Sequence, residues 1–173
     1  MAIRNIRIEG DDILRKTSRP INEMTARNQE LVDDMIESLA SFNGVGLAAV
    51  QVGVLKRLCI INIEADEEEE AEESEYARDT KGEDLVVINP EVIPVGEETQ
   101  TGTEGCLSVP KKWGTVTRPM RVILKAQDRN LKPYELKAEG LLARCICHEC
   151  DHMDGRMYID IVEGPIESED DGE

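Results

Sequence analysis

The stretch LLARCICHECDHM, residues Leu141–Met153, governs how this chain is interpreted. It follows Gly140 and is stopped by Asp154-Gly155, a pattern typical of a helix that ends at a glycine. Both histidines of the chain, His148 and His152, lie in it with the spacing H-E-x-x-H. On a helix their imidazoles stand one turn apart on one face, where they can bind a single divalent metal.

Glu149, inside the same motif, is close enough to handle a proton on water at that metal. The alternative is a surface helix with two unrelated histidines and a stray glutamate, and we regard it as the poorer interpretation because a chain with two histidines seldom produces this spacing by chance. A catalytic centre of this type needs a third protein ligand and one open position. A third ligand therefore has to be found.

Cysteines supply the candidates for that ligand. Cys145 lies on the histidine face of the helix, where a buried thiol is more often a pocket wall than a ligand. Cys147 and Cys150 form a C-x-x-C that would suit redox chemistry or structural zinc, but no second C-x-x-C accompanies it. Cys106 ends a predicted strand within EGCLS, next to a glycine that permits close backbone approach. A strand-borne cysteine facing the helix would complete a His₂Cys site.

Length and charge predict one domain with two acidic appendages. The chain has 173 residues and a net charge of −17, and almost all of this charge lies in residues 64–84 and 163–173. We expect a single catalytic domain over residues 1–163, an acidic insertion without fixed structure at 64–84, and an acidic tail at 164–173. Such segments disfavour nucleic-acid binding. An acidic arm that docks on a basic partner is the less favoured alternative.

Cysteine usage and hydropathy indicate the compartment. The five cysteines are an odd number, three of them within six positions, which suits free thiols in a reduced compartment. No signal peptide or apolar stretch of transmembrane length is evident. We expect a cytoplasmic monomer that does not bind membranes.

Apolar periodicity predicts helices near both ends and strands between them. A helix capped by Thr25 should run to about Phe42, and Asp128–Asn130 should form a hairpin turn. The predicted extended segments are residues 55–63, 85–88, 92–95 (separated from the previous one at Pro90), 101–107, 122–126 and 134–138, with a further piece at Val116. Consecutive strands with helices at the ends favour an α+β fold.

The passage GVGLAAVQVG, residues 44–53, is rich in small residues. It makes a poor helix but a good channel wall, where backbone groups can meet an extended substrate, although a tight connection is also possible. A phosphate loop is disfavoured because no G-K-[ST] follows. The amide of Gln51 is either an oxyanion donor or a structural hydrogen-bond donor, and the residues alone leave both open.

In this order, GVGLAAVQVG, EGCLS and HECDH resemble the three signature motifs of the peptide deformylase family, and the similarity extends from about Ile13 to Ile161. The resemblance implies an α+β fold with antiparallel sheets packed around a central helix that carries H-E-x-x-H. It also implies a metal-dependent hydrolase of protein biosynthesis that removes the formyl group from the N-formylmethionine of nascent polypeptides and releases formate.

The resemblance further implies a set of site residues. They are Cys106, His148 and His152 as metal ligands, Glu149 as the acid and base, Gln51 and the Leu107 backbone N–H as oxyanion donors, and Gly46 as a contact to the substrate backbone. Val45, Leu141 and Cys145 are our candidates for the methionine pocket. The family implies Fe²⁺ in the cell, whereas Zn²⁺, Ni²⁺ or Co²⁺ would also suit these ligands in a purified sample.

Some residues depart from the usual family pattern. Cys147 stands where glutamine is common, and Trp113 either lines the cleft or packs on its rim. Asp151 and Arg118 could orient the metal ligands from behind, but an ordinary surface salt bridge is the favoured expectation for either alone. The acidic tail lacks an apolar stripe, so we expect the enzyme to work near the ribosome without docking on it directly.

Two other classes of protein remain as alternatives. A metalloprotease would share H-E-x-x-H but would take a histidine or glutamate downstream as its third ligand. A non-catalytic metal-binding protein would close its site with a fourth ligand, for which Cys145 is the candidate.

Overall fold

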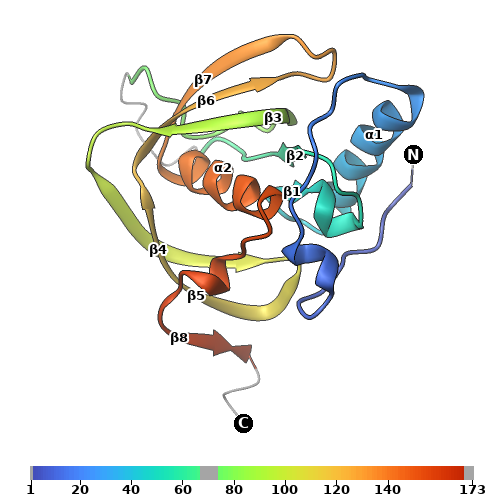
Figure 1. The fold of residues 1–173 in the computed structure, drawn as a ribbon. Helices are drawn as coiled ribbons and strands as arrows, with labels where there is room; N and C mark the ends of the chain where they lie inside the picture. Colours follow the sequence, from blue (N-terminus) through green and yellow to red (C-terminus); the bar gives the residue numbers. More distant parts are fainter. Residues whose placement is uncertain (1, 67–73, 170–173) are drawn as a thin grey trace.

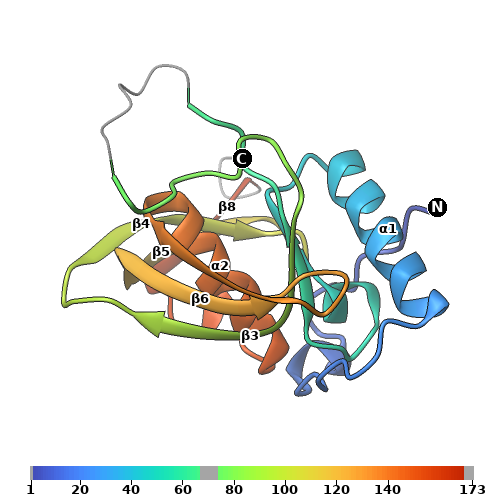
Figure 2. The same cartoon turned by 90° about the horizontal axis from the view of Figure 1, so that it is seen from above.

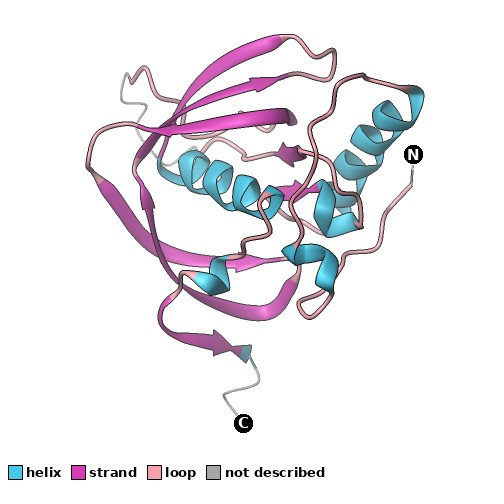
Figure 3. Ribbon diagram, viewed as in Figure 1, coloured by secondary structure: helices cyan, strands magenta, loops and turns pink. Residues whose placement is uncertain are grey.

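The computed structural model describes residues 2–66 and 74–169. Its central element is helix α2 (Gly140–Met153), which lies between two antiparallel sheets (Figure 1, Figure 3). The strand orders are β1-β2-β3-β6-β7 and β4-β5-β8. The strands are Gly46–Ala48 (β1), Leu58–Ile61 (β2), Leu85–Pro94 (β3), Thr99–Cys106 (β4), Val109–Pro119 (β5), Arg121–Gln127 (β6), Pro133–Glu139 (β7) and Glu163–Ser168 (β8). The predicted α+β fold around the H-E-x-x-H helix is confirmed.

Strand β2 is buried on both faces. All four of its side chains are inaccessible to solvent. Cys59 and Ile61 pack in the cluster that includes α2, whereas Leu58 and Ile60 pack in the cluster beneath helix α1 (Ala26–Ser41). Figure 2 shows α1 and α2 on opposite sides of this part of the sheet. Since successive strand residues point to opposite faces, a strand covered on both sides has a continuous apolar sequence.

Both long helices begin and end where the sequence predicts. The Thr25 side chain accepts a hydrogen bond of 3.1 Å from the backbone N–H of Asn28, and α1 ends at Phe42. Helix α2 starts at Gly140 and is followed by Asp154 and Gly155, the latter with a positive φ of 75°. Among the described residues, no helix has both the length and the apolar character needed to cross a membrane.

Strand β3 corrects one prediction. Residues 85–88 and 92–95 were expected to be separate strands broken at Pro90, but β3 runs through this position with a shift in its pairing to β6 between Ile88 and Glu91. Asn89 adopts a φ of 51°, and its side chain exchanges hydrogen bonds of 2.8 and 2.7 Å with the backbone of Ile21. Proline has no N–H to give to the ladder, so the irregularity accommodates it without ending the strand.

The described parts of the two acidic segments contact strands. In the insertion, residues 74–84 are held against the sheet, where Ala77 pairs with Ala138, and Ser74 and Arg78 both bind the Glu139 carboxylate. Residues 67–73 lie outside the described part of the chain. Residues 164–168 were assigned to a tail, but they belong to β8, which pairs with β5. Edge pairing needs only backbone groups, and an acidic sequence does not prevent it.

Truncation of Ile60 should be costly because the side chain is fully enclosed. We expect Ile60→Ala to lower the free energy of unfolding by about 2–5 kcal/mol through lost burial and the cavity left behind. Ile3→Ala, at a side chain 54% exposed, should change it by less than about 0.5 kcal/mol. Urea unfolding followed by circular dichroism measures both, and equal costs would contradict the assignment of β2 to the core.

Candidate active site

Helix α2 and strand β4 bring together three side chains that could hold a metal. One ligand atom each from Cys106, His148 and His152 lies within 4.8 Å of the others. The Cys106 Sγ is 3.3 Å from the His152 Nε2. Burial, followed by the nearby charge of His148, lowers the pKa of His152 well below its ordinary value. His152 is therefore neutral at pH 7, as a metal ligand must be.

The backbone of β4 places the thiol. The pairing of β4 with β5 shifts between Gly105 and Cys106, where the strand meets the turn to β5. An irregularity of this kind changes the direction of the side chain that follows. Cys106 lies 42 residues before His148 in the sequence, and only the folding of β4 beside α2 brings the two side chains together.

The Glu104 carboxylate supports the site from β4. It accepts hydrogen bonds from the Nε and Nη2 of Arg118 at 2.9 Å each, from the Nη1 of Arg144 at 2.6 Å, and from the Nδ1 of His148 at 2.8 Å. Burial raises the pKa of Glu104, but the hydrogen bonds from His148 and Arg118 outweigh it and lower the pKa to about 2. The group is a carboxylate, so the His148 Nδ1 donates to it. The hydrogen bonds from Cys106 and Glu104 outweigh burial and raise the pKa of His148 to about 10, so a metal that binds at Nε2 would displace a proton there.

Sequence reasoning missed this role of Glu104 and misjudged Arg118. Arg118 is only 5% exposed and also binds Asp151 at 2.6 Å, so its expected surface salt bridge is wrong. Arg144 could have indicated a buried carboxylate near His148, because it lies one turn before His148 on the same helix face. A buried cation there requires an anionic partner, and EGCLS contains one.

Glu149 lies in a confined position. Among the described residues, its Oε1 is buried without a hydrogen-bond partner. A methyl group at Gly46 would come within 2.4 Å of its Oε2, so β1 must carry glycine there to pass this close. Burial raises the pKa of Glu149 to about 7, opposed in part by the charge of His148. A carboxyl with this pKa both accepts and releases protons near neutral pH.

Hydrogen bonds at both ends orient the Gln51 amide. Its Oε1 accepts a hydrogen bond of 2.9 Å from the Ala48 backbone N–H. This orients the amide, and its Nε2 lies 3.1 Å from the Ser108 Oγ and 3.4 Å from the Cys106 Sγ. The side chain is thus a structural acceptor at one end and a donor directed at the site at the other.

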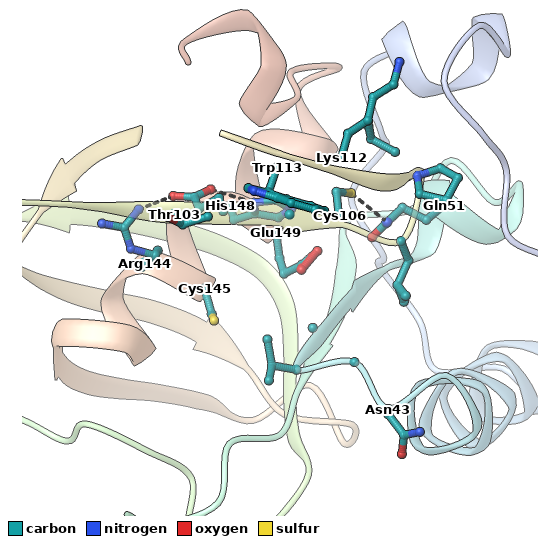
Figure 4. Close-up of a pocket in the computed structure, with 18 of the residues that line it drawn as sticks. Asn43, Gln51, Thr103, Cys106, Lys112, Trp113, Arg144, Cys145, His148 and Glu149 are labelled. Atoms are coloured by element: carbon teal, nitrogen blue, oxygen red, sulfur yellow. Dashed lines mark hydrogen bonds and ion pairs between the residues drawn. The ribbon is translucent and has the colours of Figure 1, made fainter. Parts of the chain in front are cut away.

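A cavity of about 580 Å³, drawn in Figure 4, is lined by Gln51, Glu104, Cys106, His148 and Glu149. The predicted substrate contacts all line it, namely Val45, Gly46, Leu141 and Cys145, and so does Leu107, the predicted oxyanion donor. Trp113 lines it as well. A cavity of this size accommodates a small ligand or the end of a peptide.

The donor set is suited to a divalent metal. One thiol and two imidazoles are characteristic ligands of zinc and of first-row metals such as Fe²⁺, Co²⁺ and Ni²⁺. In the described residues no other cluster of this kind occurs, so neither Cys145 nor the Cys147/Cys150 pair joins one. Burial raises the pKa of Cys145 to about 12 and that of Cys147 to about 11, which keeps these thiols protonated.

Comparison with known proteins agrees with this geometry. The profile of the family described as polypeptide deformylase matches residues 3–166. The chain belongs to this family. It is 49% identical over 166 residues to the peptide deformylase of Lachnoclostridium phytofermentans, a match that covers 96% of this chain and 93% of that one.

Solved structures extend the agreement to the fold. The crystal structure of peptide deformylase from Ehrlichia chaffeensis matches with a TM-score of 0.86 and 34% identity, over 94% of this chain and 89% of that one. The peptide deformylase from Thermotoga maritima matches with a TM-score of 0.82 and 31% identity, over 95% and 100%. The resemblance of the three motifs to this family is confirmed. The enzyme is a hydrolase, and the relationship supports removal of the N-terminal formyl group from nascent peptides.

The contact between Gly46 and Glu149 gives a test on stability. We expect Gly46→Ala to cost about 1–3 kcal/mol of unfolding free energy, because the enclosed Glu149 carboxylate cannot move aside freely. In a Glu149→Ala background the same change should cost much less, since the clashing atoms are gone. Urea unfolding of the four proteins measures the coupling. An equal cost in both backgrounds would rule out the contact.

The Glu104 network predicts a link to metal affinity. We expect Glu104→Gln to weaken metal binding about 10- to 100-fold, because His148 loses its orienting carboxylate. Glu139→Gln is the matched control: this side chain is 5% exposed against 4% for Glu104, and it also pairs with two arginines. Both variants should lose stability, but chelator competition for Co²⁺ should show weakened binding in Glu104→Gln alone. Wild-type affinity in Glu104→Gln would contradict the role.

Proposed function

We propose that this protein hydrolyses the formyl group from the N-formylmethionine of nascent polypeptides, with a divalent metal held by Cys106, His148 and His152. The observation that carries the proposal is the convergence of these three side chains beside a cavity that Cys106, His148 and the buried Glu149 line. A metalloprotease would need a downstream histidine or glutamate ligand, and none joins the cluster within the described residues. A closed structural site would need a fourth ligand, and Cys145 does not join either.

We propose Fe²⁺ as the metal in the cell and expect Zn²⁺, Ni²⁺ or Co²⁺ to be accepted by purified protein, because all suit sulfur and imidazole ligands. When bound, the metal would polarise the formyl carbonyl and lower the pKa of water in the site toward about 7. Glu104 keeps His148 in the tautomer and orientation that binding requires.

Glu149 carries the proton in this mechanism. It accepts a proton as water oxygen bonds to the formyl carbon, and it gives that proton to the methionine nitrogen as the carbon–nitrogen bond breaks. Formate and a free amine are the products. Its raised pKa, about 7, supports both roles, because the conjugate acid and base are then present in comparable amounts near neutral pH.

Two groups next to Cys106 would stabilise the oxyanion. The Gln51 Nε2 is already directed at the site by the bond from its Oε1 to Ala48. The Leu107 backbone N–H follows the ligand cysteine in the turn. Donors that are oriented before reaction stabilise a developing negative charge without reorganisation.

The other residues that line the cavity bind the substrate. Gly46 presents bare backbone to the peptide, while Val45, Leu141 and Cys145 form the apolar contacts for the methionine side chain. We propose that acetyl groups are rejected because the small chamber beside Cys106 has room for hydrogen and not for methyl.

The partner in this proposal is the nascent formyl-methionyl chain. A monomeric cytoplasmic enzyme would meet it near the ribosome without docking on ribosomal RNA through β8. The exposed acidic residues of that strand, Glu163 and Glu167, support this because RNA repels negative charge.

An activity assay tests the proposal. Protein prepared anaerobically with Fe²⁺ should release formate from formyl-Met-Ala-Ser but no acetate from the acetyl analogue. Glu149→Ala should be nearly inactive, and Gln51→Ala should lose about 10²–10³ in turnover. Glu30→Ala, an exposed glutamate of α1, should retain wild-type activity. The mechanism fails if fully metal-loaded wild type is inactive or if Glu149→Ala keeps its activity.

A further inference from the structure

Trp113 lies on the central strand of the three-stranded sheet and is partly exposed. It is the single tryptophan of the chain, lies on β5 and lines the cavity. In the sheet it stands opposite Gly105 on β4 and opposite Glu167 on β8. Gly105 has no side chain to fill the space beside the indole, and both residues line the cavity. Figure 4 shows it among the residues of the cavity wall.

Glu167 holds the indole from the other side. Its Oε2 accepts a hydrogen bond of 2.6 Å from the Trp113 Nε1. The carboxylate is a charged acceptor, and such hydrogen bonds are shorter and stronger than neutral ones. The bond ties the ring to the C-terminal strand, about 54 residues away in the chain.

Close packing at Gly114 also allows the segment before β8 to lie beside β5. A methyl group at Gly114 would come within 2.3 Å of the Val162 Cγ2 and 3.8 Å of the Tyr158 Cε2. The residue after Trp113 must therefore be small for the segment that leads into β8 to lie this close. Strand β8 is thus held in register next to the cleft and is not a loosely attached tail.

We propose that Trp113 is a substrate-binding residue for the part of the peptide that follows formylmethionine, and that Glu167 is its positioning residue. The inference rests on the proposed function. In that function, the cavity residues Cys106, Glu149 and Cys145 contact the formyl group and the methionine side chain. Trp113 is partly exposed and faces Gly105, one residue before Cys106. An extended peptide advances about 3.3 Å per residue, so its next residues pass within reach of the indole.

This arrangement makes the C-terminal strand part of substrate selection. Without the Glu167 acceptor the indole is free to turn, and the contact with a longer peptide weakens. A substrate that ends at methionine does not reach the ring and is unaffected. A purely structural role for the pair would instead affect long and short substrates alike.

Kinetics with two substrates separate these roles. The substrates are formyl-Met amide and formyl-Met-Ala-Ser, and the measured quantity is the ratio of their kcat/KM values. Glu167→Ala should lower the preference for the longer substrate about two- to tenfold, chiefly through KM, as expected for one aromatic contact. Glu167→Gln keeps an acceptor oxygen and should retain the preference. Glu163→Ala removes an exposed charge from the same strand and should also retain it.

A double-mutant cycle and fluorescence add independent readouts. Trp113→Phe removes the donor, so adding Glu167→Ala to it should change nothing further. Because Trp113 is the only tryptophan, the emission of the wild type should shift as the product peptide Met-Ala-Ser is titrated in. In Glu167→Ala the half-saturation point should move to higher peptide concentration. Urea unfolding checks that each variant is folded.

The outcomes distinguish the two proposals. An unchanged substrate ratio in Glu167→Ala and in Trp113→Phe overturns this inference, and so does an equal loss for both substrates. If the wild type hydrolyses neither substrate while the peptide still shifts its emission in a Glu167-dependent way, the proposed function fails and Trp113 remains a peptide-binding residue.

Discussion

The Glu104 carboxylate is the point on which the site depends. It joins β4 and β5 to helix α2 by accepting hydrogen bonds from Arg118, Arg144 and His148. Two buried guanidinium groups would be strongly unfavourable without this anion, and the anion would be unfavourable without them. The network therefore orients the helix relative to the strand that carries Cys106. The same contact that holds the layers together also orients a metal ligand, so stability and site geometry cannot vary independently.

A second constraint is the small-residue stretch that forms β1 and the turn after it. Gly46 lets the backbone pass against Glu149, and Gln51 uses its own oxygen to hold the Ala48 N–H while its nitrogen faces the site. Larger residues would displace the carboxyl, and an apolar residue at Gln51 would leave a buried N–H without a partner. The composition of this stretch is explained by contacts across the cavity rather than by its own secondary structure.

Local patterns predicted most elements correctly. The caps at Thr25 and Gly155 mark helix ends because capping involves neighbours within a few residues. The prediction failed at Pro90, where a missing donor was taken as the end of a strand, and at residues 164–168, where acidic composition was taken as a tail. In both places pairing with a distant strand decided the outcome. The surface salt bridge expected for Arg118 failed for the same reason, since its burial comes from packing against α2.

The sequence by itself determined that His148, Glu149 and His152 lie close together, because helical geometry places residues three and four apart on one face. It also determined that the centre of the chain would form strands around such a helix. Only the tertiary structure decided which cysteine joins the histidines, which carboxylate orients His148, and how Gln51 and Trp113 face the cavity. These relations connect residues 40 to 57 positions apart in the chain. No local preference encodes them, and the packing of two sheets against one helix establishes all of them together.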